Sequence, residues 1–186
     1  MEKILNREEG RLLADRIAKE AEVSLRECYQ CGKCSAGCPM AGSFDLMPRQ
    51  IVHLMQLGDM DSVMKSKSIW LCASCHTCVE RCPHDINIPV LMEQSRMEAQ
   101  KRGICAVRNV RLFNDIFTET VRTFGKSQEV ILEGLYNVSS GRLLQDVGNV
   151  PAMIQKGIVR PELNSVQDKD HVRSIMNKCE EGGAVQ

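Results

Sequence analysis

The sequence lacks several features that mark common classes of protein. Its 24 basic and 24 acidic residues give a formal net charge of zero, so its electrostatics do not indicate binding to nucleic acid or to an anionic membrane. The opening segment, MEKILNREEGRLLADRIAKE, is charged and helix-patterned, without the uninterrupted apolar stretch of a secretory signal. No stretch approaches the roughly 18 consecutive apolar residues of a membrane span. We therefore expect a soluble, cytoplasmic protein with no membrane span and no nucleic-acid partner.

The sequence also lacks a G-x-G-x-x-G motif, which is typical of dinucleotide binding. We therefore expect neither flavin nor NAD in this chain. At 186 residues the chain is long enough for one moderate domain, or for a small cofactor domain with an appendage.

Cysteine, in contrast, is abundant: ten residues are many for a chain in a reducing compartment, where structural disulfides are disfavoured. Eight of them form two runs of the pattern C-x2-C-x2-C-x3-C-P. The first motif is CYQCGKCSAGCP, residues 28–39, and the second is CASCHTCVERCP, residues 72–83, with each cysteine 44 positions after its counterpart. The other two, Cys105 and Cys179, are expected to be small buried apolar residues without a function. Clustered thiols of this kind indicate metal ligands or redox groups.

Four kinds of site use clustered cysteines. A disulfide framework is disfavoured because cysteines three apart in a tight loop pair poorly. A thioredoxin-like site needs one reactive pair, whereas a third cysteine follows each pair here. Structural zinc is the serious competitor, although zinc ribbons place two cysteines on each of two knuckles, and this sequence supplies three plus one, twice. The fourth kind, a pair of [4Fe-4S] clusters, is the one that the spacing favours.

A cubane cluster has an iron at each of four corners, and a loop with cysteines at i, i+3 and i+6 can wrap three of them from one side. In two-cluster ferredoxins with this run, the fourth cysteine ligates the other cluster. Applied here, the pattern predicts one cluster on Cys28, Cys31, Cys34 and Cys82, and a second on Cys72, Cys75, Cys78 and Cys38. Full cysteine ligation leaves no open iron for a substrate. We therefore expect electron transfer, and no catalytic residue in this chain.

Residues beside the ligands have less specific interpretations. His76 is not expected to be a ligand, because all four cysteines of its motif are present; it would tune the neighbouring cluster or face a partner. Trp70 is expected to pack beside the second motif. Gly32 and Gly37 either let backbone amides approach the cluster sulfurs or are ordinary turn glycines.

Helical signals surround both motifs, and no stretch between them alternates as a strand should. Pro48 suits a first helical position, and Gly58 a helix end. Asp61 or Ser62 is the expected cap of the next short helix. Pro89 opens another helix, which stops near Gly103.

The C-terminal region carries an apolar stripe at helical spacing that is typical of a core-facing helix. The stripe consists of Val110, Phe113, Phe117, Val121 and Phe124. Ser127 is the expected cap of the following helix, and only short helical pieces are expected beyond residue 140. The fold class is therefore predicted to be all-α. We expect a ferredoxin domain over residues 1–103 and a helical, partner-docking extension over residues 104–186.

The combination of two four-cysteine motifs with helical segments on either side resembles the α-helical ferredoxin fold, in which two cubane motifs lie in loops that join short helices. The closer resemblance runs through PRQIVHLMQLGDMDSVMKSKSIWLCASCHTCVERCP, residues 48–83, which is similar to the C subunit of heterodisulfide reductase. That methanogen complex reduces the mixed disulfide of coenzyme M and coenzyme B. The resemblance covers residues 5–125, and related modules of glycolate and glycerol-3-phosphate dehydrogenases are also similar.

The resemblance implies a non-catalytic electron-transfer subunit of an oxidoreductase. Its clusters would relay electrons from a flavin-containing A subunit to a catalytic B subunit, in a complex with a hydrogenase or a formate dehydrogenase and with electron bifurcation at the flavin. The B subunit of the family holds its clusters in CCG motifs, and this sequence has no adjacent cysteine pair. The alternatives are a relay subunit of another complex, either heterodisulfide-reductase-like or of the glycolate or glycerol-3-phosphate dehydrogenase type, and an independent ferredoxin.

Overall fold

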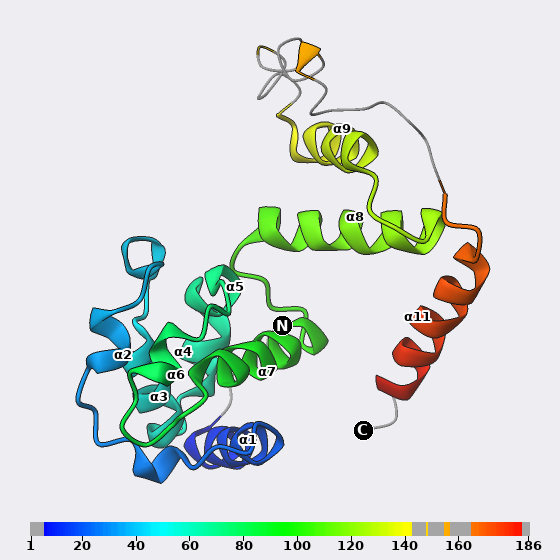
Figure 1. Cartoon of the computed structure of the whole chain (residues 1–186). Helices are drawn as coiled ribbons and strands as arrows, with labels where there is room; N and C mark the ends of the chain where they lie inside the picture. The colour runs from blue at the N-terminus through cyan, green and yellow to red at the C-terminus, as the bar shows by residue number, and fades with distance from the viewer. Residues whose placement is uncertain (1–5, 143–147, 149–154, 157–164, 184–186) are drawn as a thin grey trace. The chain divides into compact units, whose positions relative to one another are not determined.

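The structure is a computed structural model that describes residues 6–142, 148, 155–156 and 165–183. Every regular element in these residues is a helix, so the expected all-α fold is confirmed (Figure 1). The chain divides into two compact units, Met1–Val107 and Arg108–Gln186, which we call the N-terminal and C-terminal units. The division falls in the short segment that joins helix α7 to helix α8.

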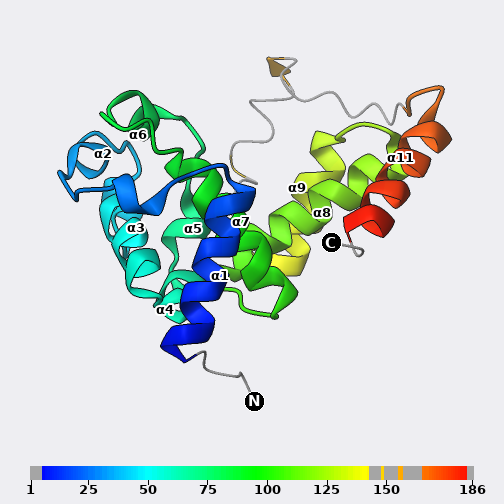
Figure 2. The same ribbon diagram turned by 90° about the horizontal axis from the view of Figure 1, so that it is seen from below.

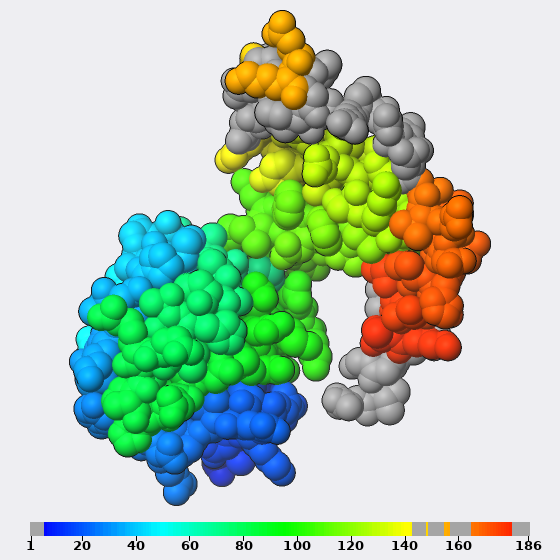
Figure 3. Space-filling model, viewed as in Figure 1, coloured from blue at the N-terminus to red at the C-terminus, as the bar shows by residue number. Residues whose placement is uncertain are grey.

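The N-terminal unit contains both cysteine motifs between its helices. In chain order its elements are α1 (Arg7–Glu20), η1 (Leu25–Glu27), α2 (Lys33–Ala36), η2 (Ala41–Ser43), α3 (Pro48–Leu57), α4 (Met60–Lys65), α5 (Ser68–Leu71), α6 (Thr77–Glu80) and α7 (Ile88–Lys101). Helices α1, α3, α4 and α7 pack on one another, with α1 lying across α7 in the view of Figure 2. Figure 3 shows the segments from α1 to α7, coloured blue to green, as one closely packed body.

The core of this unit is built from the apolar faces of those four helices. Its fully buried side chains include Ile17, Ile51, Met55, Met60, Met64 and Leu91. These residues recur at helical spacing along α3 and α4, so burying one face of each helix removes a continuous apolar stripe from water. Such burial stabilises the fold by about 1.5 to 3 kcal/mol for each large side chain. The short helices that carry the motifs are attached to this core at one end.

Helix α1 begins with a side-chain cap. Asn6 is the N-cap: its side chain accepts a hydrogen bond from the Glu9 N–H at 2.8 Å, and its own N–H donates to the Glu9 carboxylate at 3.1 Å. This reciprocal pair satisfies two amides that the first turn would otherwise leave without partners. One turn further on, a Cβ added to Gly10 would overlap the carbonyl oxygen of Gly58. The glycine therefore permits close backbone contact between α1 and the end of α3.

Both expected ends of α3 are confirmed, whereas the expected cap of α4 needs correction. Pro48 is the first residue of α3, and Gly58 ends that helix in the left-handed conformation with φ 75°. The cap of α4, however, is Asp59 and neither Asp61 nor Ser62, because the helix starts at Met60 and the Asp59 carboxylate accepts the Ser62 N–H at 3.1 Å.

Helix α7 also starts one residue earlier than expected. Pro89 is its second residue, and the side chain of Asn87 caps the helix by accepting the Val90 N–H at 3.4 Å. Proline is tolerated at this position because the amides of the first turn have no partner within the helix. The helix ends before Gly103, whose φ of 75° is left-handed, as the sequence predicts.

The C-terminal unit contains α8 (Arg108–Phe124), α9 (Glu129–Ser140) and α11 (Lys169–Gly183), with α9 and α11 both packed against α8. The prediction of only short helical pieces beyond residue 140 is wrong for α11, which has 15 residues. Helix α9 follows Gln128, so Ser127 is not its cap, and no side chain caps it.

The prediction that the α8 stripe forms a core is also wrong for its aromatic centre. Phe113 and Phe117 are each 42% exposed, although their rings stack on each other with centroids 6.4 Å apart. Among the described residues of this unit, α8 has two helical neighbours, α9 and α11, and they leave part of its apolar face uncovered.

Candidate iron-sulfur site

The two motifs share one backbone conformation although their spacer residues differ. In the first motif, Gln30 and Gly32 have positive φ angles of 63° and 82°. In the second, Ser74 and His76 have positive φ angles of 48° and 58°. These positions are 44 residues apart in each case, so the sequence repeat is also a structural repeat. Left-handed residues between the cysteines curve each loop so that its thiols face a common side.

The third cysteine of each motif lies in a four-residue helix. Helices α2 and α6 occupy equivalent positions of the repeat and pack against each other. Gly32 precedes the first of these helices and His76 precedes the second, and both residues are left-handed. The left-handed conformation of Gly32 is one that favours glycine, whereas His76 adopts the same conformation with a side chain.

A small cavity brings the last cysteine of the first motif to the second motif. Its lining includes Cys38 together with Cys72, Cys75 and Cys78, which are the four cysteines predicted to hold one cluster. The rest of the lining is mostly apolar and includes Phe44, Pro48, Pro89 and Met92 from the end of η2 and the starts of α3 and α7. His76 also lines the cavity. This wall would exclude water from one side of a group bound to the thiols.

The cysteines of the first motif differ in exposure. Cys34 is buried, Cys28 is half-buried and Cys31 is exposed. The pKa of the Tyr29 hydroxyl is raised, first by hydrogen bonding to Cys31, then by burial and by the charges of Cys31 and Cys82. Because the charge of Cys82 acts on Tyr29, Cys82 of the second motif lies near this residue of the first. Cys82 is thus brought to the side of the first motif, in parallel with the placement of Cys38 beside the second.

The ends of the two motifs lie side by side. Gly37, which precedes Cys38, faces the side chain of Arg81, which precedes Cys82; a Cβ on Gly37 would lie 2.6 Å from the Arg81 Cδ and Nε atoms. Gly37 has a φ of −107°, which any residue can adopt, so its lack of a side chain matters because of Arg81. Two equivalent positions of the repeat therefore meet where the chain leaves each motif.

The thiols differ in their protonation equilibria. Burial raises the pKa of the Cys78 thiol to about 12, with the charge of Cys72 as the next cause, and burial also raises the pKa of Cys34. The pKa of Cys31 is lowered, chiefly by the Lys33 N–H, and the pKa of Cys75 is lowered, chiefly by the Thr77 hydroxyl. A coordinating metal deprotonates a thiol outright, so a high pKa in the free thiol is compatible with ligation.

The donor set fits a cubane. Among the residues that the structure describes, no three His, Cys, Asp or Glu side chains converge closely enough to bind a single metal ion. A four-iron cluster is larger than one ion and takes a single thiolate at each corner, so its ligands stand further apart. Cys28, Cys31, Cys34 and Cys82 would hold one such cluster, and Cys72, Cys75, Cys78 and Cys38 the other.

Asp45 fixes the approach to the second motif. Its carboxylate accepts hydrogen bonds from the Ser66 hydroxyl at 2.7 Å, the Lys67 N–H at 2.8 Å and the Ser68 hydroxyl at 2.7 Å. Burial raises the pKa of Asp45, but these hydrogen bonds outweigh burial and hold its pKa well below the usual range. They tie the segment after η2 to the start of α5, which ends at Cys72.

The remaining candidates have different surroundings. Trp70 is 2% exposed and lies in the core two residues before Cys72, as expected. Cys105 is half-buried and packs against the core of the N-terminal unit. Cys179 is exposed on α11, so the expectation of burial is wrong for that residue.

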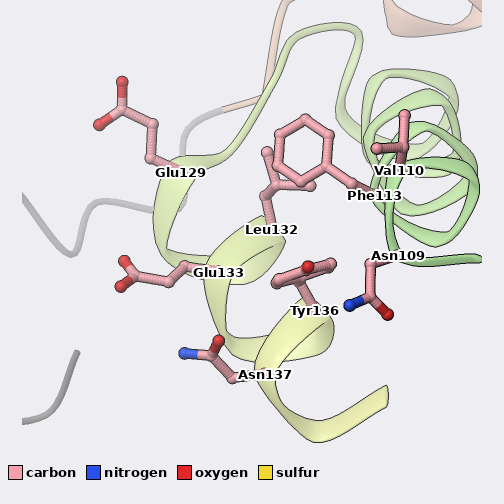
Figure 4. A pocket seen from close by; sticks show the side chains of 8 residues that line it. All are labelled: Asn109, Val110, Phe113, Glu129, Leu132, Glu133, Tyr136 and Asn137. Carbon is pink, nitrogen blue, oxygen red and sulfur yellow. The ribbon is translucent and has the colours of Figure 1, made fainter. Parts of the chain in front are cut away.

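A larger cavity of about 400 Å³ lies in the C-terminal unit, between α8 and α9. In Figure 4 the rings of Phe113 and Tyr136 and the side chain of Leu132 line its apolar part, while the carboxylates of Glu129 and Glu133 point away from the rings. The rings of Phe113 and Tyr136 meet edge to face with centroids 5.8 Å apart. This cavity contains no cysteine and is separate from both motifs.

None of the helices in the described ranges has the length and apolar character needed to cross a bilayer.

Comparison with known proteins agrees with this site. A family model described as a 4Fe-4S dicluster domain matches residues 24–86, which include all eight motif cysteines. The chain is 39% identical over 95 residues to the iron-sulfur C subunit of CoB--CoM heterodisulfide reductase from Methanopyrus kandleri, covering 50% of each chain. The resemblance to the C subunit of heterodisulfide reductase is thereby confirmed.

Other C subunits of heterodisulfide reductases match over similar lengths. The C2 subunit of the H(2)/formate:CoB-CoM heterodisulfide,ferredoxin reductase of Methanococcus maripaludis is 40% identical over 88 residues, 47% of each chain. The C subunit of the H(2):CoB-CoM heterodisulfide,ferredoxin reductase of Methanothermobacter marburgensis is 32% identical over 111 residues, 55% of this chain and 60% of the relative. The chain thus spans about half the length of the curated relatives it matches.

Proposed function

We propose that this chain is the electron-transfer subunit of a heterodisulfide-reductase-type complex in the cytoplasm. It relays electrons from a flavin-containing A subunit to a catalytic B subunit, which reduces the heterodisulfide of coenzyme M and coenzyme B. One observation carries the proposal: Cys38 lines a single cavity with Cys72, Cys75 and Cys78. The domain in which this occurs resembles proteins that are named as subunits of heterodisulfide reductases.

The two ligand sets cross between the motifs. The first set is Cys28, Cys31 and Cys34 with Cys82, and the second is Cys72, Cys75 and Cys78 with Cys38. The contact between Gly37 and Arg81 supports this crossing, because it holds the two chain segments that lead to Cys38 and Cys82 next to each other. When bound, [4Fe-4S] clusters supply one-electron redox chemistry.

The protein's own residues protect and neutralise this site. The apolar wall of Phe44, Pro89 and Met92 would limit the access of water to the second ligand set. A four-thiolate cubane carries a net charge of about −2 when oxidised, and Arg81 and Lys33 place positive charge in the motifs themselves. Full cysteine ligation leaves no coordination site for a substrate, so the chain would transfer electrons without catalysing the reduction itself.

Metal analysis tests the cluster content directly. The full chain, purified or reconstituted under anaerobic conditions, should contain about eight irons and matching sulfide, as two [4Fe-4S] clusters require. After reduction it should show the electron paramagnetic resonance (EPR) signal of two clusters. Zinc in stoichiometric amount, with iron absent, would replace the proposal with a zinc-stabilised module.

Co-purification tests the assignment to a complex. Tagged chain, isolated anaerobically from its native cells, should bring down a flavoprotein and a CCG-motif protein, together with a hydrogenase or a formate dehydrogenase. Names of relatives that include H(2) or formate support such an upstream donor. If native extract instead contained the chain only near its monomer mass, it would be an independent ferredoxin.

A further inference from the structure

The side chains around the two motifs differ although the backbones match. Three side chains of the first motif lie within hydrogen-bonding reach of its own cysteines. The Gln30 amide donates to the Cys28 sulfur at 3.3 Å. The Tyr29 hydroxyl lies near enough to the Cys31 sulfur for hydrogen bonding between them to raise the pKa of the hydroxyl. The Ser35 hydroxyl lies 3.9 Å from the sulfur of Cys34.

The second motif has fewer such donors. The positions equivalent to Tyr29, Gln30 and Ser35 are Ala73, Ser74 and Val79. Alanine and valine have no polar hydrogen to donate. In the second motif as the structure describes it, the one side-chain hydrogen bond at a cysteine is donated by the Cys75 thiol to the Thr77 Oγ1 at 3.4 Å. When Cys75 is a thiolate, the Thr77 hydroxyl is the group that can donate.

The Gln30 donor is held in place from helix α3. Gln56 accepts a hydrogen bond from the Gln30 amide at 3.4 Å, and its own amide donates to the carbonyl oxygens of Leu25 at 2.7 Å and Cys28 at 3.0 Å. Gln56 therefore positions both the backbone of Cys28 and the side chain that reaches the Cys28 sulfur.

The backbone donor at the second cysteine of each motif is repeated, so it does not contribute to this difference. The Lys33 N–H is hydrogen-bonded to Cys31, and the equivalent Thr77 N–H is hydrogen-bonded to Cys75. Each of these amides follows a left-handed residue at the equivalent position of the repeat, Gly32 in the first motif and His76 in the second. At Cys31 and Cys75 the asymmetry therefore lies in the side chains.

A hydrogen bond to a ligand sulfur stabilises negative charge on that sulfur and thereby favours the reduced form of a cluster. We infer that Tyr29, Gln30 and Ser35 give the cluster held by the first motif a more positive reduction potential than the cluster held by the second. This inference rests on the proposed function, since it requires both clusters to be bound. An electron delivered to the protein would then reside mainly at the first motif.

Exchanging the donors for the residues of the second motif tests the inference. The variant Tyr29→Ala/Gln30→Ser/Ser35→Val is compared with the wild-type full chain in an anaerobic redox titration followed by EPR. The wild type should show two midpoint potentials, and the variant should shift the higher one to more negative values while the lower one stays. Gln30→Ser alone should give a smaller shift in the same direction.

Thr77→Val is the matched control in the second motif. It should lower the lower midpoint and leave the higher one unchanged. A wild type with a single midpoint for both clusters would overturn the inference, as would a triple variant in which only the lower midpoint moves or neither moves. Iron content distinguishes these outcomes from failure of the proposed function. Every comparison of midpoint potentials is made on protein with about eight irons per chain. A wild-type chain without reducible clusters would contradict the proposed function itself.

Discussion

Arg81 lies against Gly37, and the two residues occupy equivalent positions of the 44-residue repeat. Each immediately precedes the last cysteine of its motif. The contact explains how a local sequence pattern becomes a shared site: the chain leaves both motifs at one place, where Cys38 lines a cavity with the second motif and Cys82 lies beside Tyr29 of the first. Neither motif is then an independent binding loop, and loss of one is expected to affect the other through an exchanged ligand.

The backbone contact between α1 and α3 predicts a sharp effect at Gly10. In the variant Gly10→Ala, the new Cβ would overlap the carbonyl oxygen of Gly58, and backbone atoms cannot move aside as a flexible side chain can. We expect a loss of about 1 to 3 kcal/mol in the free energy of unfolding, the usual range for overpacking. Chemical denaturation of the cluster-loaded protein, followed by far-UV circular dichroism, measures it. Gly42→Ala is the control, since no atom lies within 4 Å of a Cβ there; equal stability of the two variants would contradict the prediction.

The Asp45 hydrogen bonds predict that Asp45→Ala lowers stability. The change leaves the Lys67 N–H and the buried Ser68 hydroxyl without their acceptor, which costs about 1 to 3 kcal/mol. The pKa of Asp45 is depressed in the folded state, so its contribution is complete above the unfolded pKa and is lost only as pH falls through the folded value. The difference between wild type and variant should therefore be the same at pH 6 and pH 8.

Denaturation curves at both pH values check this prediction, with the exposed Asp15→Ala as control. A stability difference that disappeared between pH 8 and pH 6 would place the pKa of this carboxylate far above the usual range of Asp, and would contradict the depressed pKa. Faster loss of iron from Asp45→Ala than from the control is also expected, because the hydrogen bonds hold the turn that leads to Cys72.

The sequence predicted those parts of the fold that depend on local chemistry. Proline and glycine marked both ends of α3 correctly, because their backbone preferences act at the residue itself. The repeat predicted two similar loops, but it did not predict that His76 would take the left-handed conformation of Gly32, since a side chain makes that conformation unfavourable in isolation. The carboxylate of Asp45 was missed because its partners lie more than 20 positions away in the sequence.

The aromatic stripe of α8 shows a different limit. Helical spacing predicted one apolar face correctly, but it carries no information on which element covers that face. Phe113 and Phe117 remain 42% exposed, and Val138 on α9 is 65% exposed. Exposed apolar residues of this kind are typical of a surface that binds another protein.

Phe117→Ser is therefore expected to weaken assembly with the partner subunits. Aromatic side chains dominate binding energy at interfaces, so a loss of about tenfold or more in affinity is expected. Anaerobic pull-down of the flavin-containing and catalytic partners by the variant measures it, with iron content as the test that the N-terminal unit is intact. Thr118→Ser, at the exposed neighbouring position, is the control. Unchanged recovery of both partners with Phe117→Ser would exclude this face from the interface.

The crossing of ligands makes its most specific prediction at Cys82. In Cys82→Ser, the cluster on Cys28, Cys31 and Cys34 loses its fourth thiolate, while the second ligand set keeps all four, including Cys38. We expect iron to fall from about eight to between four and seven per chain, depending on whether the damaged cluster is lost or keeps three irons. The reduced variant should lose the EPR signal of the first-motif cluster and retain that of the other.

Cys38→Ser is the reciprocal variant and should damage the cluster on Cys72, Cys75 and Cys78 instead. Cys105→Ser, outside both motifs, should keep about eight irons and serves as the control for handling. Pairing Cys82→Ser with a second change tests the ligand sets: Cys34→Ser added to Cys82→Ser should leave the cluster on Cys72, Cys75, Cys78 and Cys38 intact, because Cys34 and Cys82 serve the other cluster. The opposite pattern would contradict the crossing. If the double variant Cys78→Ser/Cys82→Ser kept one cluster and the double variant Cys34→Ser/Cys82→Ser lost both, each motif would hold its own cluster.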